Sequence, residues 1–391
     1  MTKATRHAHH AAPKPAVLQV IPALDAGGSE RTTIEITQAL TRDGFRALVA
    51  SEGGRLEKEL AAAGGELIRL PMETKRPGKM MANAKRLTKI IREHNIALVH
   101  ARSRAAAWSA YYAAKRTRVP FIATFHGIYK AKGPLKRFYN TVMLRGDAVI
   151  ANSEWTARHI RDTYRTKPKR LAIIPRGVDL DRFDPGGVTP DRIVRLRAAW
   201  AREGERVVLL PGRLTRWKGQ LTFIEALGLL RRAGHLDGVR GVIAGDAQGR
   251  EAYVAELITA MADKGLTNVV TIPGHIADMA AAYLAADIVV SDSTDPEAFG
   301  RAAAEAAAMG RPVIATDHGG ARETVIPGET GLLVPPGDAK ALADAIAELL
   351  DRSDEELDEM GRKGRAHIAT RYTVDRMCAD TLALYRDLIG K

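Results

Sequence analysis

The sequence predicts an α/β protein with two doubly wound parallel sheets. Short apolar runs alternate with amphipathic helical patterns along almost the whole chain, and this alternation occurs twice. Such alternation is typical of parallel sheets with helices on both faces. The two series meet at Asp184-Pro185-Gly186-Gly187, a Pro/Gly cluster where the net charge also changes sign. Two facing sheets leave a cleft at the carboxyl ends of their strands, where ligands of open α/β sheets bind.

Each series contains runs that are short and apolar enough to be buried strands. In the first series these are residues 17–21, 47–50, 67–70, 97–100, 121–124, 148–151 and 171–174. Helices are predicted between them, for example over 30–40, 79–93, 105–115 and 155–164. In the second series the strands are residues 207–210, 239–244, 269–272, 288–291, 313–316 and 332–334. The end of the chain is helical over 339–350, 355–369 and 375–389.

These elements predict four segments. Residues 1–15 form a flexible basic tail, 16–185 a first domain, 186–372 a second domain, and 373–391 a final helix. The helical residues after Thr373 exceed what the second sheet needs for cover.

The composition excludes several classes of protein. A length of 391 residues fits two or three domains at roughly 150 residues each. The single cysteine, Cys378, excludes a disulfide scaffold and a cysteine-based zinc cluster. No apolar run reaches the ~18 residues that span a bilayer, and residues 1–15 lack the apolar core of a secretory signal. We therefore expect a soluble cytoplasmic protein.

The charge is unevenly divided between the two halves. Up to Asp184 the chain has 34 basic and 16 acidic side chains, a net charge of +18, whereas the remaining 25 basic and 30 acidic side chains give −5. No carboxylate occurs from residue 94 to residue 146, a stretch of 53 residues. Charge runs usually form solvated faces, but this one also suits an anionic partner: nucleic acid, a phosphorylated substrate or a membrane surface.

Two motifs follow strands of the first series. Gly27 and Gly28 let backbone amides approach a ligand closely, and Ser29 suits the start of a helix whose N-terminus attracts anions. A tight structural turn is an equally good interpretation, and the dinucleotide spacing G-x-G-x-x-G is missing. His126, followed by Gly127, lies at the end of another strand, where it can hydrogen-bond a substrate. A lone histidine is more often structural.

Two further motifs follow strands of the second series. Arg213 and Lys218 lie after the first of these strands, and together they can neutralise a diphosphate leaving group. Glu297 and Glu305 are separated by seven residues across a strand-to-helix junction. Because Glu305 lies inside an Ala-rich helix, we expect it to have a partner. Paired carboxylates also occur in glycosidases, but here phosphate-binding features surround them.

Taken in order, these motifs resemble the retaining glycosyltransferases of family 4, which have the GT-B fold of two facing Rossmann-like domains. The resemblance covers the chain from about Val17 to its end. It rests on five segments: Gly27-Gly28, Asn152-Ser153, Pro175-Arg176-Gly177-Val178-Asp179, Gly212-Arg213 with Lys218-Gly219, and Glu297 with Glu305. One departure is Arg176, because the family often has Asn there; we interpret it as tolerated variation near the interdomain linker.

The resemblance implies roles for individual residues. The second domain would bind a nucleotide-diphosphate sugar, the first an acceptor, and residues 373–391 would cross back to the first domain. Donor contacts would come from Gly27, Gly28, Arg213, Lys218, Gly245, Pro273, Gly274, Glu297, Ala298, Phe299, Gly300, Arg301 and Glu305. Within this set Glu297 would contact the sugar hydroxyls, Glu305 the ribose, and Arg213 and Lys218 the diphosphate. His126 would face the transferred sugar, and with Glu297, Arg213 and Lys218 it completes the predicted catalytic set. Because Arg213 and Lys218 supply positive charge for the diphosphate, we expect no metal and no other cofactor.

A membrane contact is a further expectation. The acid-free stretch ends in mixed basic and aromatic residues that suit the cytoplasmic face of an anionic membrane carrying a lipid-linked or lipopolysaccharide-type acceptor. The residues concerned are Lys130, Lys132, Lys136, Arg137 and Phe138. Alternatively, Phe138 and Tyr139 are core residues, or a phosphate-rich soluble acceptor accounts for the charges.

Other functions remain open at this point. A phosphorylase or a nucleotide-sugar epimerase can have a similar two-domain fold, since a fold does not fix a function. Nucleic-acid binding would fit the basic half. The sequence lacks a recognised nucleic-acid motif and the interleaved aromatic residues of single-strand binders, so we expect no nucleic-acid partner.

Overall fold

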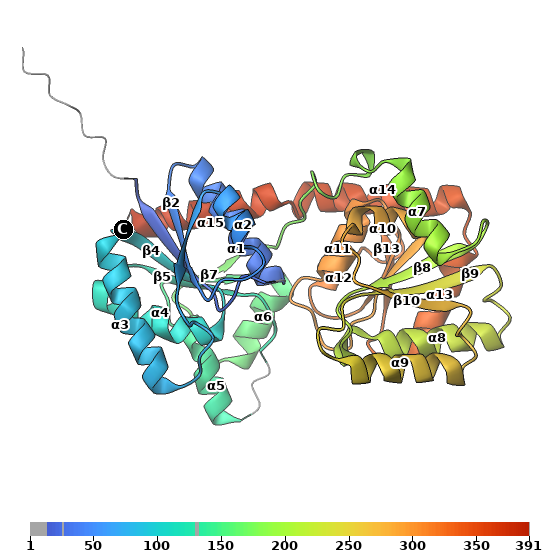
Figure 1. Cartoon of the computed structure of the whole chain (residues 1–391), viewed down its shortest axis with the longest axis horizontal. Helices are drawn as coiled ribbons and strands as arrows, with labels where there is room; N and C mark the ends of the chain where they lie inside the picture. The colour runs from blue at the N-terminus through green and yellow to red at the C-terminus, as the bar shows by residue number, and fades with distance from the viewer. Residues whose placement is uncertain (1–13, 26, 130–132, 391) are drawn as a thin grey trace, which may run out of the picture.

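The computed structural model describes residues 14–25, 27–129 and 133–390, which form two α/β domains side by side (Figure 1). Most of the expected tail lies outside these ranges. The first domain has a seven-stranded sheet of order β3-β2-β1-β4-β5-β6-β7, in which all neighbours are parallel. Its strands are β1 Ala16–Val20, β2 Arg46–Ser51, β3 Gly65–Arg69, β4 Ile96–Ala101, β5 Phe121–Phe125, β6 Ala148–Ala151 and β7 Leu171–Ile173. The helices between them are α1 Gly28–Arg42, α2 Glu57–Ala62, α3 Pro77–Glu93, α4 Arg104–Thr117, α5 Pro134–Asn140 and α6 Glu154–Thr163.

The second domain repeats this plan with six parallel strands in the order β10-β9-β8-β11-β12-β13. Its strands are β8 Arg206–Pro211, β9 Val239–Ala244, β10 Val270–Gly274, β11 Ile288–Ser291, β12 Val313–Thr316 and β13 Gly331–Val334. Its helices are α7 Pro190–Trp200, α8 Gln220–Arg232, α9 Glu251–Asp263, α10 Met279–Ala285, α11 Arg301–Ala308, α12 Ala321–Thr324, α13 Ala339–Leu350 and α14 Asp354–Arg371. The predicted pair of doubly wound sheets is confirmed.

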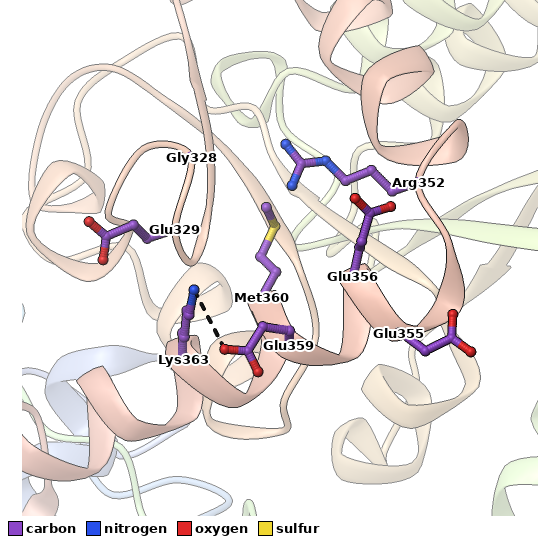
Figure 2. Close-up of a pocket in the computed structure, with 8 residues that line it drawn as sticks. All are labelled: Gly328, Glu329, Arg352, Glu355, Glu356, Glu359, Met360 and Lys363. Atoms are coloured by element: carbon purple, nitrogen blue, oxygen red, sulfur yellow. Dashed lines mark ion pairs between the residues drawn. The ribbon is translucent and has the colours of Figure 1, made fainter.

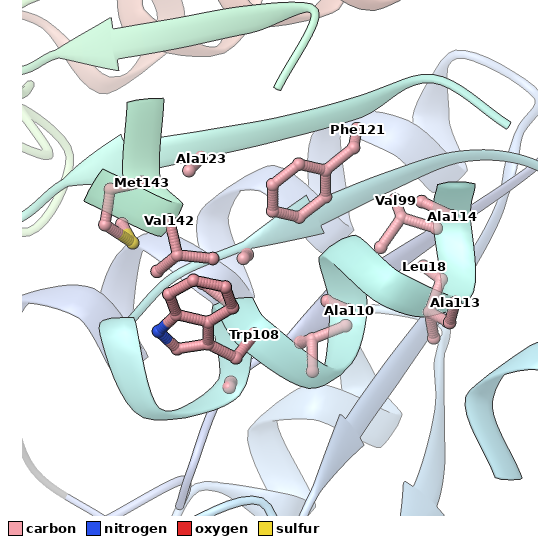
Figure 3. Packing of buried hydrophobic residues seen from close by; sticks show 14 of the residues in the cluster. Leu18, Val99, Trp108, Ala110, Ala113, Ala114, Phe121, Ala123, Val142 and Met143 are labelled. Carbon is pink, nitrogen blue, oxygen red and sulfur yellow. The ribbon is translucent and has the colours of Figure 1, made fainter. Parts of the chain in front are cut away.

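Apolar side chains fill the space between sheet and helices in both domains. In the first domain Trp108 of α4 packs with Phe121, Val142 and Met143 against the sheet (Figure 3). The central strand β1 is fully buried, as expected for a parallel sheet covered on both faces. No helix in the described part of the chain is long and apolar enough to cross a bilayer.

Two segments join the domains, and they touch. Val178 donates its amide to the carbonyl of Tyr372 (2.7 Å) and accepts from the amide of Val374 (3.0 Å). Gly177 allows this approach, because a Cβ there would lie 2.2 Å from the carbonyl carbon of Thr373. Beyond this crossing α15, Val374–Ile389, lies on the first domain (Figure 1).

Helix α15 completes the core of the first domain. Met377, Leu382 and Tyr385 pack with residues of β1, α1 and β5, and the Tyr385 hydroxyl lies 2.5 Å from Nδ1 of His100. The surplus helix is therefore part of the first domain's packing, so relative movement of the domains must bend the chain at both crossing segments.

Candidate active site between the two domains

The strand orders explain where the polar loops gather. In each sheet the order reverses at one position, between β1 and β4 in the first domain and between β8 and β11 in the second. Such switch points open a crevice at the carboxyl ends of the strands. The loops that carry Gly28, Lys218 and Glu297 all begin there, and His126 follows the adjacent strand β5.

Lys218 and Glu297 form the centre of the second domain's site. Lys218 Nζ donates to Glu297 Oε1 at 2.7 Å, and Ser293 Oγ donates to the same oxygen at 2.5 Å. The two charged side chains are 14% and 15% exposed. Burial alone would raise the pKa of Glu297, but the charge and hydrogen bond of Lys218 hold that pKa below its usual value. No described residue bonds Glu297 Oε2, which is therefore available to a substrate hydroxyl.

Glu305 has the partner that its position predicts. Arg301, one turn earlier in α11, donates to Glu305 Oε1 from Nε at 2.9 Å and from Nη2 at 2.6 Å. The Tyr283 hydroxyl donates to Oε2 at 3.1 Å. Both carboxylate oxygens are thus engaged within the domain, and any ribose contact must share them. Gly300, with a φ of 83°, supplies the left-handed turn that starts this helix.

Three glycines of the predicted motifs, Gly212, Gly245 and Gly274, lie close together at the carboxyl ends of neighbouring strands of the second sheet. A Cβ on Gly245 would lie 1.8 Å from the carbonyl oxygen of Gly212, and the Gly245 amide donates to the Gly274 carbonyl at 2.9 Å. The ends of β8, β9 and β10 are therefore in close contact, with Pro273 exposed beside them. Arg213 differs from Lys218, because its side chain is exposed and forms no ion pair with a described residue.

In the first domain, the two ring nitrogens of His126 are buried, and neither has a hydrogen-bond partner among the described residues. Burial lowers the pKa of His126 well below its usual value, and the charges of Arg102 and Arg176 lower it further. An imidazole held neutral can donate one hydrogen bond and accept another. The sequence placed this residue at the site but gave no sign of the two arginines around it.

Arg176, expected as tolerated variation near the interdomain linker, is buried where the first domain faces the cleft. Its side chain is only 6% exposed, and a Cβ on Gly28 would lie 2.4 Å from its Nη1. A cavity of about 20 Å³ beside it is lined by Thr32, Arg102, Thr124, His126, Ile150, Asn152, Ile174, Arg176, Met377 and Thr381. The available signal was a charged residue three positions after the end of β7, and this alone does not distinguish a cleft residue from a linker residue.

A larger pocket lies elsewhere in the second domain. It measures about 280 Å³ and is lined by Gly328, Glu329, Arg352, Glu355, Glu356, Glu359, Met360 and Lys363 (Figure 2). None of these residues belongs to the cleft site. Four glutamates line it, and their charge disfavours a diphosphate ligand.

Direct contacts hold the two halves of the cleft together. Glu323, in α12, accepts the amides of Glu154 (3.0 Å) and Trp155 (2.7 Å) at the start of α6. Thr156 donates from Oγ1 to the carbonyl of Ala298 at 3.2 Å. Nothing in the sequence predicts Glu323 as an interdomain contact, because its partners are 168 and 169 residues away.

Asp292, directly after β11, is a further residue that the sequence did not single out. It is 1% exposed, and within the described part of the chain neither carboxylate oxygen has a hydrogen-bond partner that meets geometric criteria. Burial raises the pKa of Asp292 to about 8, and the nearby Thr222 hydroxyl offsets only part of this effect. A charged residue that interrupts the apolar strand sequence was the available signal.

The predicted membrane face is described only in part. Lys130 and Lys132 lie outside the described residues. Phe138 is 57% exposed and Leu135 is 85% exposed, so Phe138 is not a core residue. Tyr139, in contrast, is partly buried and packs against the first domain's core. Lys136 and Arg137 are both exposed on the same short helix.

The two facing parallel-sheet domains have the GT-B architecture of solved glycosyltransferases. Residues 26–182 match the family model "Glycosyltransferase Family 4", and residues 195–367 match "Glycosyl transferases group 1". A glycosyltransferase from Rickettsia africae is 34% identical, with a TM-score of 0.88 over 97% of this chain and 99% of that one. The chain therefore belongs to this glycosyltransferase family.

Two further relatives show how far the similarity reaches. HepE of Anabaena, solved with UDP and glucose, is 27% identical, with a TM-score of 0.81 over 94% of this chain and 99% of that one. The D-inositol 3-phosphate glycosyltransferase of Segniliparus rotundus is 32% identical over 69% of this chain. The chain spans 62% of that relative's length, and 57% of the length of the enzyme of the same name from Corynebacterium urealyticum.

Proposed function

We propose that this protein is a retaining glycosyltransferase. It moves a sugar from a UDP- or GDP-linked donor to a saccharide or lipid-linked acceptor in the synthesis of cell-envelope polysaccharide or lipopolysaccharide. The observation that carries this proposal is the Lys218–Glu297 pair at the switch point of the second sheet. The relative crystallised with UDP and glucose supports a nucleotide-sugar donor.

In this proposal Glu297 and Lys218 have different roles at the donor. Glu297 Oε1 is held by Lys218 and Ser293, which leaves Oε2 to accept a sugar hydroxyl. The ammonium of Lys218 and the exposed guanidinium of Arg213 stabilise the negative charge that develops on the departing diphosphate. His126, being neutral, hydrogen-bonds the sugar.

Retention follows from attack on the face that the leaving group occupies. The acceptor oxygen forms a bond to the anomeric carbon while the bond from that carbon to the diphosphate oxygen breaks. The diphosphate leaves with the electron pair and takes the acceptor's proton. Catalysis then rests on positioning and on electrostatic stabilisation of the leaving group.

We propose that no divalent metal takes part. The chain has one D-x-D sequence, Asp179-Leu180-Asp181, in the segment that joins the domains. There the Asp179 carboxylate accepts the amides of Asp181 and Arg182, each at 3.1 Å, and so stabilises a turn. Lys218 and Arg213 supply positive charge at the donor instead.

A donor screen tests the proposal. The full chain is incubated with UDP- and GDP-sugars and candidate saccharide acceptors, with and without EDTA, and released nucleoside diphosphate is measured. We expect acceptor-dependent release from at least one donor, unchanged by EDTA. Release that stops in EDTA and returns with Mg²⁺ or Mn²⁺ contradicts the metal-free mechanism. Release without any acceptor product contradicts transfer.

We also propose that the first domain docks on an anionic membrane to reach a lipid-linked acceptor. Helices α3, α4 and α5 lie along one side of this domain (Figure 1). Leu135 and Phe138 expose apolar surface there, next to Lys136 and Arg137. Each basic residue near an anionic surface contributes ~1 kcal/mol of binding, and the apolar side chains add insertion at the headgroup level.

Liposome co-sedimentation tests this docking. We expect binding to anionic vesicles that falls as salt rises, and that weakens when Lys130, Lys132, Lys136 and Arg137 are replaced by Ser. The control replaces four exposed basic residues of the second domain, Arg231, Arg232, Arg250 and Lys340. Protein that stays in the supernatant with anionic vesicles at low salt overturns the docking proposal.

A further inference from the structure

Arg176 lies where the first domain faces the cleft. It follows β7, and its backbone amide donates to the carbonyl of Asn152 at 3.3 Å. Its guanidinium lies against the Cα of Gly28, the first residue of the 15-residue helix α1. The first amides of a helix have no partner within the helix and carry partial positive charge. The guanidinium and the helix start are two sources of positive potential at one place, and the carboxylate of Glu30, in the first turn of α1, offsets part of it.

Arg176 has no ion-pair partner among the described residues. Arg176 is 6% exposed, its Nε has no hydrogen-bond partner, and no described carboxylate forms an ion pair with it. The acids Glu35, Glu305 and Glu30 act on it only at a distance, and Arg301 repels it. Burial lowers the pKa of Arg176 to about 10, so that it stays charged at neutral pH. A buried charge without a partner is costly, and such groups are usually neutralised by a pair or a ligand.

We propose that Arg176 and the start of α1 form a phosphate subsite on the first domain's side of the cleft. The subsite binds a phosphate group of a substrate, either the donor's diphosphate or a phosphate on the acceptor. A guanidinium suits this task, because its planar donors match two oxygens of one phosphate. The inference rests on the proposed function and adds a specificity-determining residue to it.

A structural role for Arg176 makes a different prediction. A guanidinium that holds the loop at Gly28 in place would stabilise the unliganded protein, so its removal would lower the melting temperature. A buried guanidinium whose anionic ligand is not bound destabilises the unliganded protein, because its charge is unpaired. An uncharged side chain of similar length should therefore leave the melting temperature unchanged or raise it. The two roles therefore differ in sign, and stability and binding separate them.

The test uses Arg176→Met, which removes the charge. A second variant, Arg176→Lys, keeps the charge but lacks the planar donors of the guanidinium. Melting temperatures are measured for the full chain alone and with UDP, GDP or inorganic pyrophosphate, and KM values are measured for donor and acceptor. Charge-assisted hydrogen bonds of this kind change affinity by about tenfold or more. We expect Arg176→Met to lose at least tenfold in affinity, with Arg176→Lys intermediate. Arg161→Met, at an exposed arginine of α6, is the control.

The outcomes distinguish the sources of the phosphate. Weaker binding of nucleoside diphosphate and pyrophosphate with a raised donor KM assigns the subsite to the donor, and a raised acceptor KM alone assigns it to the acceptor. Wild-type affinity and wild-type KM values in both variants overturn the inference, as does a lower melting temperature without a binding defect. A wild-type protein that binds and releases no nucleotide contradicts the proposed function instead, and pyrophosphate still tests Arg176 in that case.

Discussion

The two sides of the cleft differ in how their buried cations are paired. In the second domain Lys218 and Arg301 are each paired with a carboxylate, Glu297 and Glu305. In the first domain Arg176 is buried without an ion pair to any described residue, and burial, together with the charges of Arg102 and Arg176, lowers the pKa of His126 well below its usual value. Pairing fixes the geometry of a cation before substrate arrives, whereas an unpaired cation gains its partner only when an anion binds. The comparison suggests that the second domain's donor site is arranged before substrate binds. The first domain, across the cleft, has in Arg176 a cation that is paired only when an anion binds.

Breaking the second domain's pair should have the largest effect. Glu297→Gln keeps the shape of the side chain but leaves Lys218 without its counter-charge, and Lys218→Met does the reverse. Each should lower kcat by about 10²–10³, the usual loss for one charge-stabilising contact in an active site. Asp344→Asn, in the exposed pair with Lys340, is the control and should not change the rate. Variants of Glu297 and Lys218 with near wild-type turnover would show that the site is elsewhere.

The buried carboxyl group of Asp292, in the second domain, should make the stability of the protein depend on pH. Asp292 has a pKa of about 8 when folded and an ordinary one when unfolded, so the folded state binds the extra proton between these values. Stability therefore falls as pH rises through this range. Asp292→Asn should be little changed in melting temperature at pH 5 and several degrees higher than wild type at pH 8.5. The exposed Asp237→Asn should show no such trend; equal melting curves for Asp292→Asn and wild type at both pH values would contradict the burial effect.

The contact between the two sides should give the smallest effect. Glu323→Ala removes the acceptor of two amides at the start of α6, an interaction worth about 1–2 kcal/mol. We expect the donor KM to rise several-fold with little change in kcat. Without this contact, the arrangement in which the two domains meet across the cleft is less populated. Glu329→Ala, at an exposed glutamate of the same domain, is the control. An unchanged KM for Glu323→Ala would show that this contact does not limit closure.

The fold was predictable because parallel strands are apolar along their whole length. Strands such as β1 and β12 match the apolar runs within one residue. β3 is displaced by up to two residues because it is an edge strand with a half-exposed pattern, where polarity no longer marks its ends. Boundaries are thus clear only where both faces are covered.

The site was predictable to the extent that its residues follow strands. Glu297 and Lys218 were predicted from their positions after strands and from the family resemblance, and the structure brings them together. Arg176 and Glu323 could not be assigned in this way, because each acquires its meaning from a partner distant in the sequence. Arg176 stands out because it has no ion-pair partner among the described residues, and the absence of a partner cannot be read from a sequence.

The most direct test of the account is the stereochemistry of transfer. With the donor found in the screen, the anomeric configuration of the first-formed product is determined by proton NMR from the coupling constant of its anomeric proton. If the diphosphate is held on the face where the acceptor attacks, the product has the same anomeric configuration as the donor. A product of inverted configuration would contradict the account.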